Sequence, residues 1–308
     1  MDRPQHHRAF VITIFWTLGL LFLGSVVHAT ESSLACPDWP TCFGTMVPEM
    51  TGGVFWEHLH RLVAGGLILF FCGAIYLTWK ERPRGSRLMK AAWAGLGLLL
   101  IQALFGGLTV LLLLPDWIST SHLGLAFLFL GLTTVLAVVS APSWDARSRQ
   151  DPTPHPLLGR LAMGGATLAF AQSLLGAAVR HTDAGLGCPD VPLCLGQWIP
   201  TLAHPLVILH FSHRVLGLAL LMVVLLVGHI AFWHGVTPVQ RRLGLAAASV
   251  AVAQVLLGFL SVYYGLAVVP VSLHTLLAAI LLTLLVALVT LTWSSSGGSG
   301  TDREMGTS

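Results

Sequence analysis

The stretch CPDWPTCFG at residues 36–44 returns 152 positions later as CPDVPLCLG at residues 188–196. A second motif, EHLHR at residues 57–61, returns as HFSHR at residues 210–214 with an offset of 153. Self-similarity at one long spacing is typical of a duplicated structural unit. The sequence therefore predicts a chain built from two copies of the same fold.

A polar, proline-rich segment at residues 143–156 separates the two copies. We therefore expect an N-terminal unit at residues 1–150 and a C-terminal unit at residues 151–308. The end of the second unit, residues 294–308, is rich in serine and glycine, and such a composition is typical of a disordered tail.

The composition places both units in a membrane. Hydrophobic residues make up 55% of the 308 residues and charged residues only 9%, with a mean hydropathy of +0.80; soluble domains carry about 25% charged residues. The apolar blocks are long enough for helices that cross a hydrocarbon layer of about 30 Å, and they lack the alternation of β-barrel strands. We expect an all-α integral membrane protein with eight transmembrane helices at residues 9–29, 54–79, 88–114, 119–142, 157–180, 206–233, 242–263 and 270–293.

Each unit would contain four spans, which is an even number. The two copies then cross the membrane in the same orientation and are related by a pseudo-twofold axis along the membrane normal. The expected architecture is two tandem four-helix bundles, a class that commonly binds cofactors between facing helices.

Lysine and arginine predict the orientation of the chain. If the N-terminus lies inside, 13 of the 16 basic residues face the cytoplasm. The positive-inside rule then predicts a multi-pass protein of the cell membrane with both termini cytoplasmic and both cysteine motifs outside. Topology explains the basic loops, so no nucleic-acid partner is expected.

Four histidines recur at matching positions: His60, His122, His213 and His274. Each falls in the first two turns of its expected helix, so at 1.5 Å per residue all four lie at a similar depth. An ionisable residue there is costly and should face a partner or a cavity. Two imidazoles on facing helices suit haem iron, whereas a catalytic zinc ion would need a third protein ligand. We predict one haem site in each unit.

Three arginines stand close to these histidines or to the outer surface. Arg61 and Arg214 each follow one of the histidines, and Arg180 ends the fifth expected helix. Arginine is suited to carboxylates, so these side chains are candidates for binding haem propionates. Extension of the arginine head towards lipid headgroups is the alternative.

Four cysteines form two pairs in the outer loops, Cys36 with Cys42 and Cys188 with Cys194. Disulfides persist in an oxidising location of this kind. We predict one bond within each loop, with either a structural or a redox role. A zinc site shared by all four is less favoured, because the two-residue spacing of common zinc motifs is missing.

The repeat breaks at Glu57, whose counterpart is His210. Glu57 lies three residues before His60 and therefore on the same helical face. A carboxylate beside a porphyrin is available for proton transfer, which predicts a reactive first unit and an auxiliary second unit. The alternative is a glutamate that reaches the interface or pairs with Arg61.

Together, the duplicated spans, the histidines and the cysteine loops resemble the haem A synthase family over residues 9–293. The resemblance implies an enzyme that oxidises a methyl group of haem O to a formyl group by successive hydroxylations, giving haem A for terminal oxidases. It also implies a partnership with haem O synthase, the farnesyltransferase that makes the substrate. The electron acceptor stays unassigned.

The resemblance also assigns roles to the candidate residues. It implies that substrate haem binds between His60 and His122, with Glu57 catalytic. It implies that haem b is the cofactor of the second unit, where His213 and His274 ligate its iron. Two other functions fit part of the pattern: a di-haem b-type cytochrome that exchanges electrons with quinone, and a transporter with a duplicated bundle.

Overall fold

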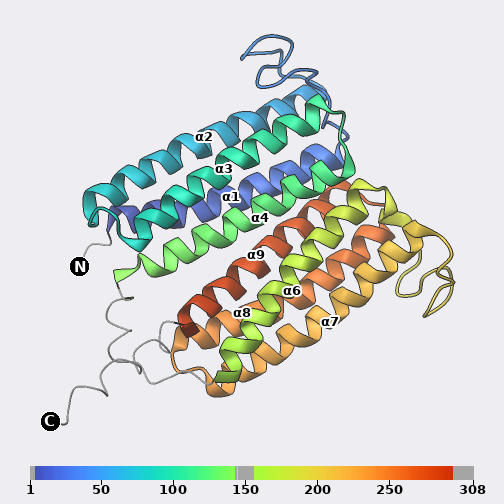
Figure 1. Cartoon of the computed structure of the whole chain (residues 1–308). Coiled ribbons are helices and arrows are strands. Elements are labelled where there is room, and N and C mark those ends of the chain that lie inside the picture. The colour runs from blue at the N-terminus through green and yellow to red at the C-terminus, as the bar shows by residue number, and fades with distance from the viewer. Residues whose placement is uncertain (1–3, 143, 145–155, 294–308) are drawn as a thin grey trace.

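The computed structural model describes residues 4–142, 144 and 156–293 (Figure 1). Within these residues, eight helices are long and apolar enough to cross a membrane. The predicted all-α membrane fold is therefore confirmed. In chain order, the helices are α1 (Gln5–Ala29), α2 (Gly52–Glu81), α3 (Arg87–Leu111), α4 (Asp116–Val139), α6 (Pro156–His181), the short 3-10 helix η1 (Ala184–Leu186), α7 (Pro205–His234), α8 (Pro238–Tyr263) and α9 (Val268–Trp293).

Local chemistry explains where the helices begin and end. The third predicted span extends to residue 114, but α3 ends at Leu111, because Leu113 and Leu114 take left-handed backbone angles with φ of 60° and 59°. Such angles are unfavourable for leucine in a helix and end it. At the start of α8, Thr237 and Gln240 form a capping box that satisfies two otherwise unpaired backbone N–H groups.

The helices form two rings of four. In the first half, α1 contacts α2, α2 contacts α3, α3 contacts α4, and α4 closes the ring on α1; α6 to α9 repeat this pattern. Between the halves, α4 contacts α9, while α1 contacts α9 and α4 contacts α6 (Figure 1). A twofold axis between α4 and α9 would produce this set of contacts.

Apolar packing holds the halves together. A buried cluster centred on Leu158, Val224 and Leu285 in the second half extends to Phe127 and Leu130 of α4. Burial of such side chains stabilises an interface by about 1.5–3 kcal/mol for each one in water, but lipid is as apolar as leucine. Close fit is therefore the main contribution inside the membrane.

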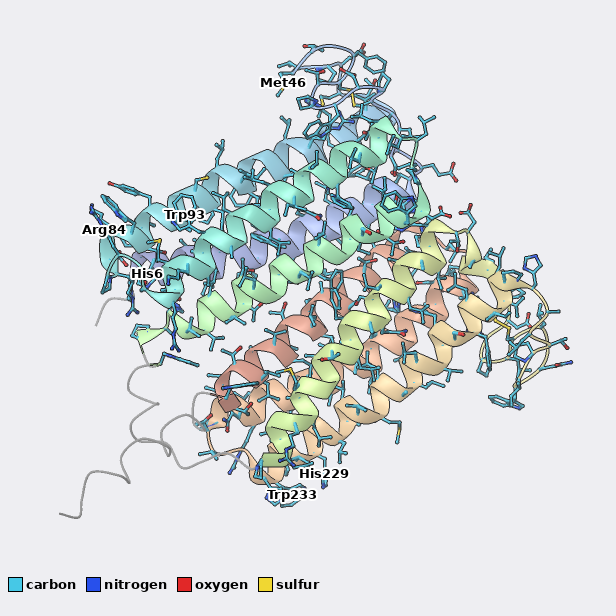
Figure 2. The ribbon with its side chains drawn as sticks, viewed as in Figure 1. His6, Met46, Arg84, Trp93, His229 and Trp233 are labelled. Carbon is cyan, nitrogen blue, oxygen red and sulfur yellow. A yellow bond between two sulfur atoms is a disulfide. The ribbon has the colours of Figure 1, made fainter. Side chains whose placement is uncertain are left out.

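The two ends of the helices differ in what they carry. Met46 lies in the loop that follows α1, at the end we call the loop end, whereas His6, Arg84 and Trp233 lie at the opposite end (Figure 2). The predicted tail at residues 294–308 lies outside the described residues, and so does most of the predicted boundary at 143–156. The division of function between the two halves stays a prediction.

Candidate functional site

The four repeated histidines each lie against a glycine of a neighbouring helix. A Cβ atom added at any of these glycines would come within 2.9–3.1 Å of the Cε1 atom of the histidine ring, which is too close without a shift of the ring. Glycine is therefore what allows the imidazole to lie against the helix backbone. The pairs are Gly24 with His60, Gly106 with His122, Gly176 with His213, and Gly258 with His274.

Two of the histidines are oriented by backbone carbonyl groups. Nδ1 of His122 lies 3.1 Å from the carbonyl oxygen of Gln102, and Nδ1 of His274 lies 3.1 Å from that of Gln254. A carbonyl oxygen only accepts, so Nδ1 carries the proton and Nε2 keeps its lone pair. Metal-ligating histidines commonly donate their other N–H in this way.

In the second half, the two histidines face each other at a separation that suits one metal ion. The ring centroids of His213 and His274 lie 6.4 Å apart, with the rings inclined by 69°. Metal–imidazole bonds of about 2 Å on each side would place two opposed ring centres roughly 6 Å apart. The separation of the two rings therefore suits two imidazole ligands of one metal ion, such as a haem iron.

A glutamine supports one histidine of this pair. The side-chain amide nitrogen of Gln172, on α6, lies 3.0 Å from Nδ1 of His213 and donates to the His213 carbonyl oxygen at 2.9 Å. Because an amide nitrogen only donates, Nδ1 of His213 accepts in this contact, unlike Nδ1 of His274. Its Oε1 atom is buried without a partner among the described residues, as are those of Gln102 and Gln254. Buried polar atoms of this kind indicate a missing hydrogen-bond partner at the site.

The first half lacks the corresponding support. The repeat places Leu20 at the position of Gln172, and Nδ1 of His60 is buried without a partner among the described residues. His60 and His122 are close enough to interact electrostatically. The first pair therefore has the same donor chemistry as the second, but only His122 is held by a neighbour.

The disulfide loops cover the loop end of both halves. Cys36 is bonded to Cys42 and Cys188 to Cys194, with Cα–Cα distances of 4.8 and 4.6 Å. Each bond lies within its own loop, as the sequence predicts. Each loop also contains an X–Pro cis peptide bond, at Pro40 in the first loop and Pro192 in the second.

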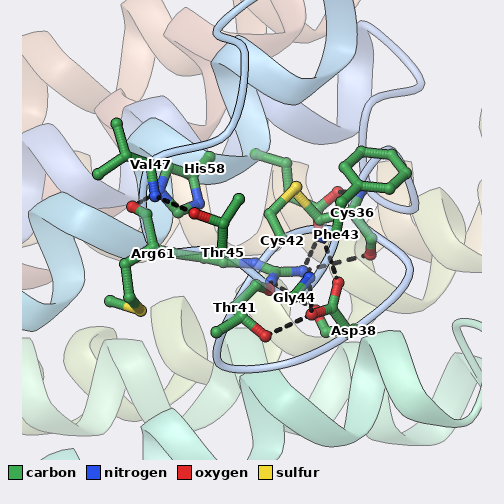
Figure 3. The surroundings of a disulfide bond; sticks show 12 residues. Cys36, Asp38, Thr41, Cys42, Phe43, Gly44, Thr45, Val47, His58 and Arg61 are labelled. Carbon is green, nitrogen blue, oxygen red and sulfur yellow. Dashed lines mark hydrogen bonds and ion pairs between the residues drawn. A yellow bond between two sulfur atoms is a disulfide. The ribbon is translucent and has the colours of Figure 1, made fainter.

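Asp38 organises the turn of the first loop (Figure 3). Its carboxylate accepts hydrogen bonds from the backbone N–H groups of Phe43 and Gly44 at 2.6 and 2.9 Å, and from the hydroxyl group of Thr41. The Thr41 bond, followed by that of Gly44, holds the pKa of Asp38 below its usual range. In the second loop, Asp190 accepts from Gly196.

Arg61 and Arg214 donate hydrogen bonds to the backbone of the two loops. Arg61 donates to the carbonyl oxygens of Asp38 at 2.6 Å and Thr41 at 2.5 Å (Figure 3). Arg214 donates to the carbonyl oxygen of Asp190 at 2.9 Å, and also to those of Cys188 and Leu193. Each guanidinium group therefore has a structural task, and its binding of propionates stays a prediction.

Arg180 has a different position from the other two arginines. It donates to the carbonyl oxygen of His28 at 3.2 Å and so connects α6 with α1 across the two halves. Its predicted contact with a propionate is likewise untested.

Glu57 lies under the first loop with 4% of its surface exposed. One carboxylate oxygen accepts from the backbone N–H of Cys36 at 2.8 Å, and the other pairs with Arg61. Its counterpart His210 lies in the same place, but its Nδ1 lies 2.9 Å from the carbonyl oxygen of Ala184 and only 3.4 Å from the backbone nitrogen of Cys188. Pairing of Glu57 with Arg61, the alternative that the sequence leaves open, is thus observed, and a catalytic role stays a prediction.

The first loop also packs on α3. A Cβ atom on Gly107 of α3 would lie 2.7 Å from Cδ2 of Trp39, so the indole ring packs on this glycine, next to the Gly106–His122 contact. In the second half, the repeat places Val191 and Phe259 at these two positions. The aromatic group is therefore carried by the loop in one half and by a helix in the other.

Sequence reasoning missed several of these residues. Gly24, Gly176 and Gln172 contact the histidines, and Trp39 packs on Gly107. Only their common offset of 152 could have identified the two glycines. Gln172 and Trp39 carry no such signal, because neither residue has an identical counterpart in the other half.

Comparisons with known proteins support the relationship that these residues suggest. The family model of the COX15-CtaA cytochrome oxidase assembly proteins matches residues 7–286. A protein of Halalkalibacterium halodurans named Heme A synthase is 32% identical, over 66% of this chain and 68% of its own. Proteins of the same name from Lysinibacillus sphaericus and Shewanella oneidensis are 27% and 26% identical, over 93% and 94% of this chain and 96% and 97% of their own.

Proposed function

Since the chain belongs to the COX15-CtaA family of cytochrome oxidase assembly proteins, we propose that it is a membrane enzyme that oxidises haem O to haem A for terminal oxidases. The relatives named Heme A synthase support this function over nearly the full length of the chain. The duplicated histidine–glycine contacts are the observation that supports it most directly. In finer detail, the methyl group becomes a formyl group through successive hydroxylations.

The two histidine pairs have different roles in this proposal. His213 and His274 hold haem b permanently, and their spacing favours a retained cofactor. His60 and His122 bind the substrate haem. Nδ1 of His60 has no hydrogen-bond partner among the described residues, and Trp39 of the first loop packs on Gly107. A histidine that is held this loosely suits a substrate that must bind and leave.

Each residue then has a defined task. When bound, haem b would supply one-electron redox chemistry to the second half. Gln254 fixes the Nδ1 proton of His274, leaving Nε2 for the iron, and Gln102 does the same for His122. Glu57 holds a negative charge beside His60 and moves a proton during oxidation. Arg61, Arg180 and Arg214 are the candidates for propionate binding.

The cellular setting follows the sequence prediction. The protein lies in the cell membrane with both termini cytoplasmic, so the disulfide loops and the histidine pairs lie towards the outer surface. Haem O synthase delivers the substrate, and a separate electron acceptor oxidises the protein.

Product analysis tests this function against a di-haem cytochrome. The full-length chain is expressed in cells that make haem O but not haem A, and the haems are extracted and separated by chromatography. We expect haem A and a hydroxylated intermediate, neither of which appears in cells without the chain. A purified protein that is loaded with haem b but converts no haem O would contradict the proposal, and a colourless protein would favour the transporter.

A further inference from the structure

We propose that the seam between α2 and α3, towards the end of the helices opposite the loop end, binds the prenyl tail of the substrate haem. The inference rests on the proposed function, because a substrate made by a farnesyltransferase carries such a tail. α1 and α4 contact the second half, which leaves α2 and α3 on the outer side of the first half (Figure 1). A tail in their seam can therefore enter from the surrounding lipid.

The seam contains a cavity of about 630 Å³. Ligand pockets in proteins typically have volumes of about 300–1,000 Å³ and apolar walls. Arg84 lies over the ring of Trp79 at 5.2 Å, on the far side from the loop end (Figure 2). The other walls are apolar or aromatic, which suits a hydrocarbon chain; they include Cys72, Ile75, Tyr76 and Trp79 of α2, and Met89 and Trp93 of α3.

The equivalent seam of the second half is closed. Of the helices that follow one another within a half, α2 and α3 touch least, whereas their counterparts α7 and α8 touch most. A Cβ atom on Gly228 of α7 would lie 2.8 Å from that of Ala248 of α8, and such small residues let helices approach closely in a membrane. The repeat places Ile75 and Leu96 at these two positions. Haem b has no prenyl tail, so the half proposed to hold it needs no such cavity.

The cavity lies at the depth that the tail would reach. A porphyrin of this type carries its propionates on one edge and the tail on the opposite edge, so propionates at the loop end direct the tail along α2. Cys72 follows His60 by twelve residues, which is about 18 Å along a helix. An extended chain of about 14 carbon atoms reaches roughly 17 Å at about 1.2 Å per bond. The far part of the tail would therefore lie beside Cys72.

A bound tail would select the substrate and orient it. Lipid is as apolar as the cavity, so close packing rather than transfer from water provides the preference for a haem with a tail. Anchoring the tail also fixes the rotation of the porphyrin about the axis through its iron ligands. The same methyl group is then always presented to the same protein residues, which is the positioning that an oxidation of one methyl group requires.

Alkylation of Cys72 tests this site without measuring activity. The other four of the five cysteines form disulfides, so Cys72 is the free thiol of the chain, and it is exposed in the cavity wall. The full-length protein, purified from cells without haem O synthase, is treated with N-ethylmaleimide in the presence of haem O or haem b, and mass spectrometry follows the modification. We expect haem O to slow alkylation about fivefold, a modest effect because packing alone holds the tail. Equal rates with haem O and haem b would overturn the proposal.

Chromatography of the haems from matched samples separates this inference from the proposed function. Protection of Cys72 without conversion of haem O would support the tail site and contradict the proposed function. Conversion of haem O without protection of Cys72 would overturn the tail site and leave the proposed function intact.

A variant that fills the cavity gives a second test. Cys72→Phe adds a ring to the cavity wall, and Leu225→Phe makes the matched change at the equivalent position of the second half. Haem O and haem b are each titrated, by absorbance, into protein whose second pair already holds haem b. Cys72→Phe should weaken binding of haem O about fivefold and leave that of haem b unchanged, whereas Leu225→Phe should change neither. Unchanged affinity for haem O in Cys72→Phe, or an equal loss for both haems, would overturn the proposal.

Discussion

The two halves share one scaffold but support their histidines differently. Both place each imidazole against a helix glycine near the loop end. In the second half, Gln172 reaches His213 from within the helices, whereas the first half has Leu20 there and leaves Nδ1 of His60 without a partner. The comparison shows that duplication provided two similar histidine pairs whose surroundings differ; in the proposed function, this difference suits one pair to retention of haem and the other to exchange.

The largest expected effect concerns Glu57, the acidic residue where the second half has His210. Glu57→Gln keeps an acceptor for the N–H of Cys36 but removes the charge that pairs with Arg61. Conversion of haem O should fall by roughly 10²–10⁴-fold, the usual range for loss of a general acid or base. Chromatography of the extracted haems measures this loss.

The matched control for Glu57 is His210→Gln, which changes the equivalent position in the other half. We expect this variant to lower conversion far less. If Glu57→Gln forms haem A at the normal rate, the carboxylate serves only to hold the loop. The difference between Glu57 and His210 would then have no role in the reaction.

A smaller effect is expected for Gln172. Gln172→Leu gives the second half the residue of the first and removes the contact with His213. Loss of a residue that orients a metal ligand typically costs 10–100-fold in affinity. The haem b content of the purified protein, followed during dilution into apomyoglobin, should show correspondingly faster loss.

Leu20→Gln is the reciprocal change in the first half. It should slow the release of haem from the His60–His122 pair and leave haem b retention unchanged. Unchanged haem b retention in Gln172→Leu would show that this amide does not distinguish the two sites.

The smallest expected effect is the acid sensitivity of the first loop. Hydrogen bonds hold the pKa of Asp38 below its usual range, so its carboxylate contributes stability above the unfolded value near pH 4, and this contribution is lost as the pH falls through the lower folded value. Amide protection of Phe43 and Gly44 should therefore decrease below about pH 4. Because Asp38 is accessible to solvent, the change should be modest.

Hydrogen-exchange mass spectrometry, corrected for intrinsic exchange, measures this protection. Asp38→Asn should lower it already at neutral pH and remove its acid dependence. The second loop lacks the hydroxyl donor, because Leu193 replaces Thr41, so Asp190→Asn should have the smaller effect. Equal acid sensitivity of both loops would contradict this reading.

The sequence predicts the parts of the molecule that depend on periodicity and duplication. The eight spans follow from apolar blocks, the pairing of cysteines from their spacing within a loop, and the positions of His60 and His213 from the repeat. The supporting residues do not follow in this way. Trp39 contacts Gly107 and Gln172 contacts His213 through packing between distant segments, which no local pattern encodes.

The contacts of Glu57 could likewise be predicted only in part from the sequence. Its place on the face of His60 follows from helical spacing, but its bond to the N–H of Cys36 depends on how the first loop folds back over α2. The backbone angles that end α3 were missed for a similar reason, since Leu113 and Leu114 have no turn-forming side chain.

Haem analysis of matched histidine variants tests the central claim most directly. The claim is that His60 and His122 bind substrate haem, while His213 and His274 retain haem b. Purified His60→Ala should contain normal haem b and form no haem A, whereas purified His274→Ala should lose haem b and its low-spin spectrum. Loss of haem b from His60→Ala with normal haem b in His274→Ala would contradict the account.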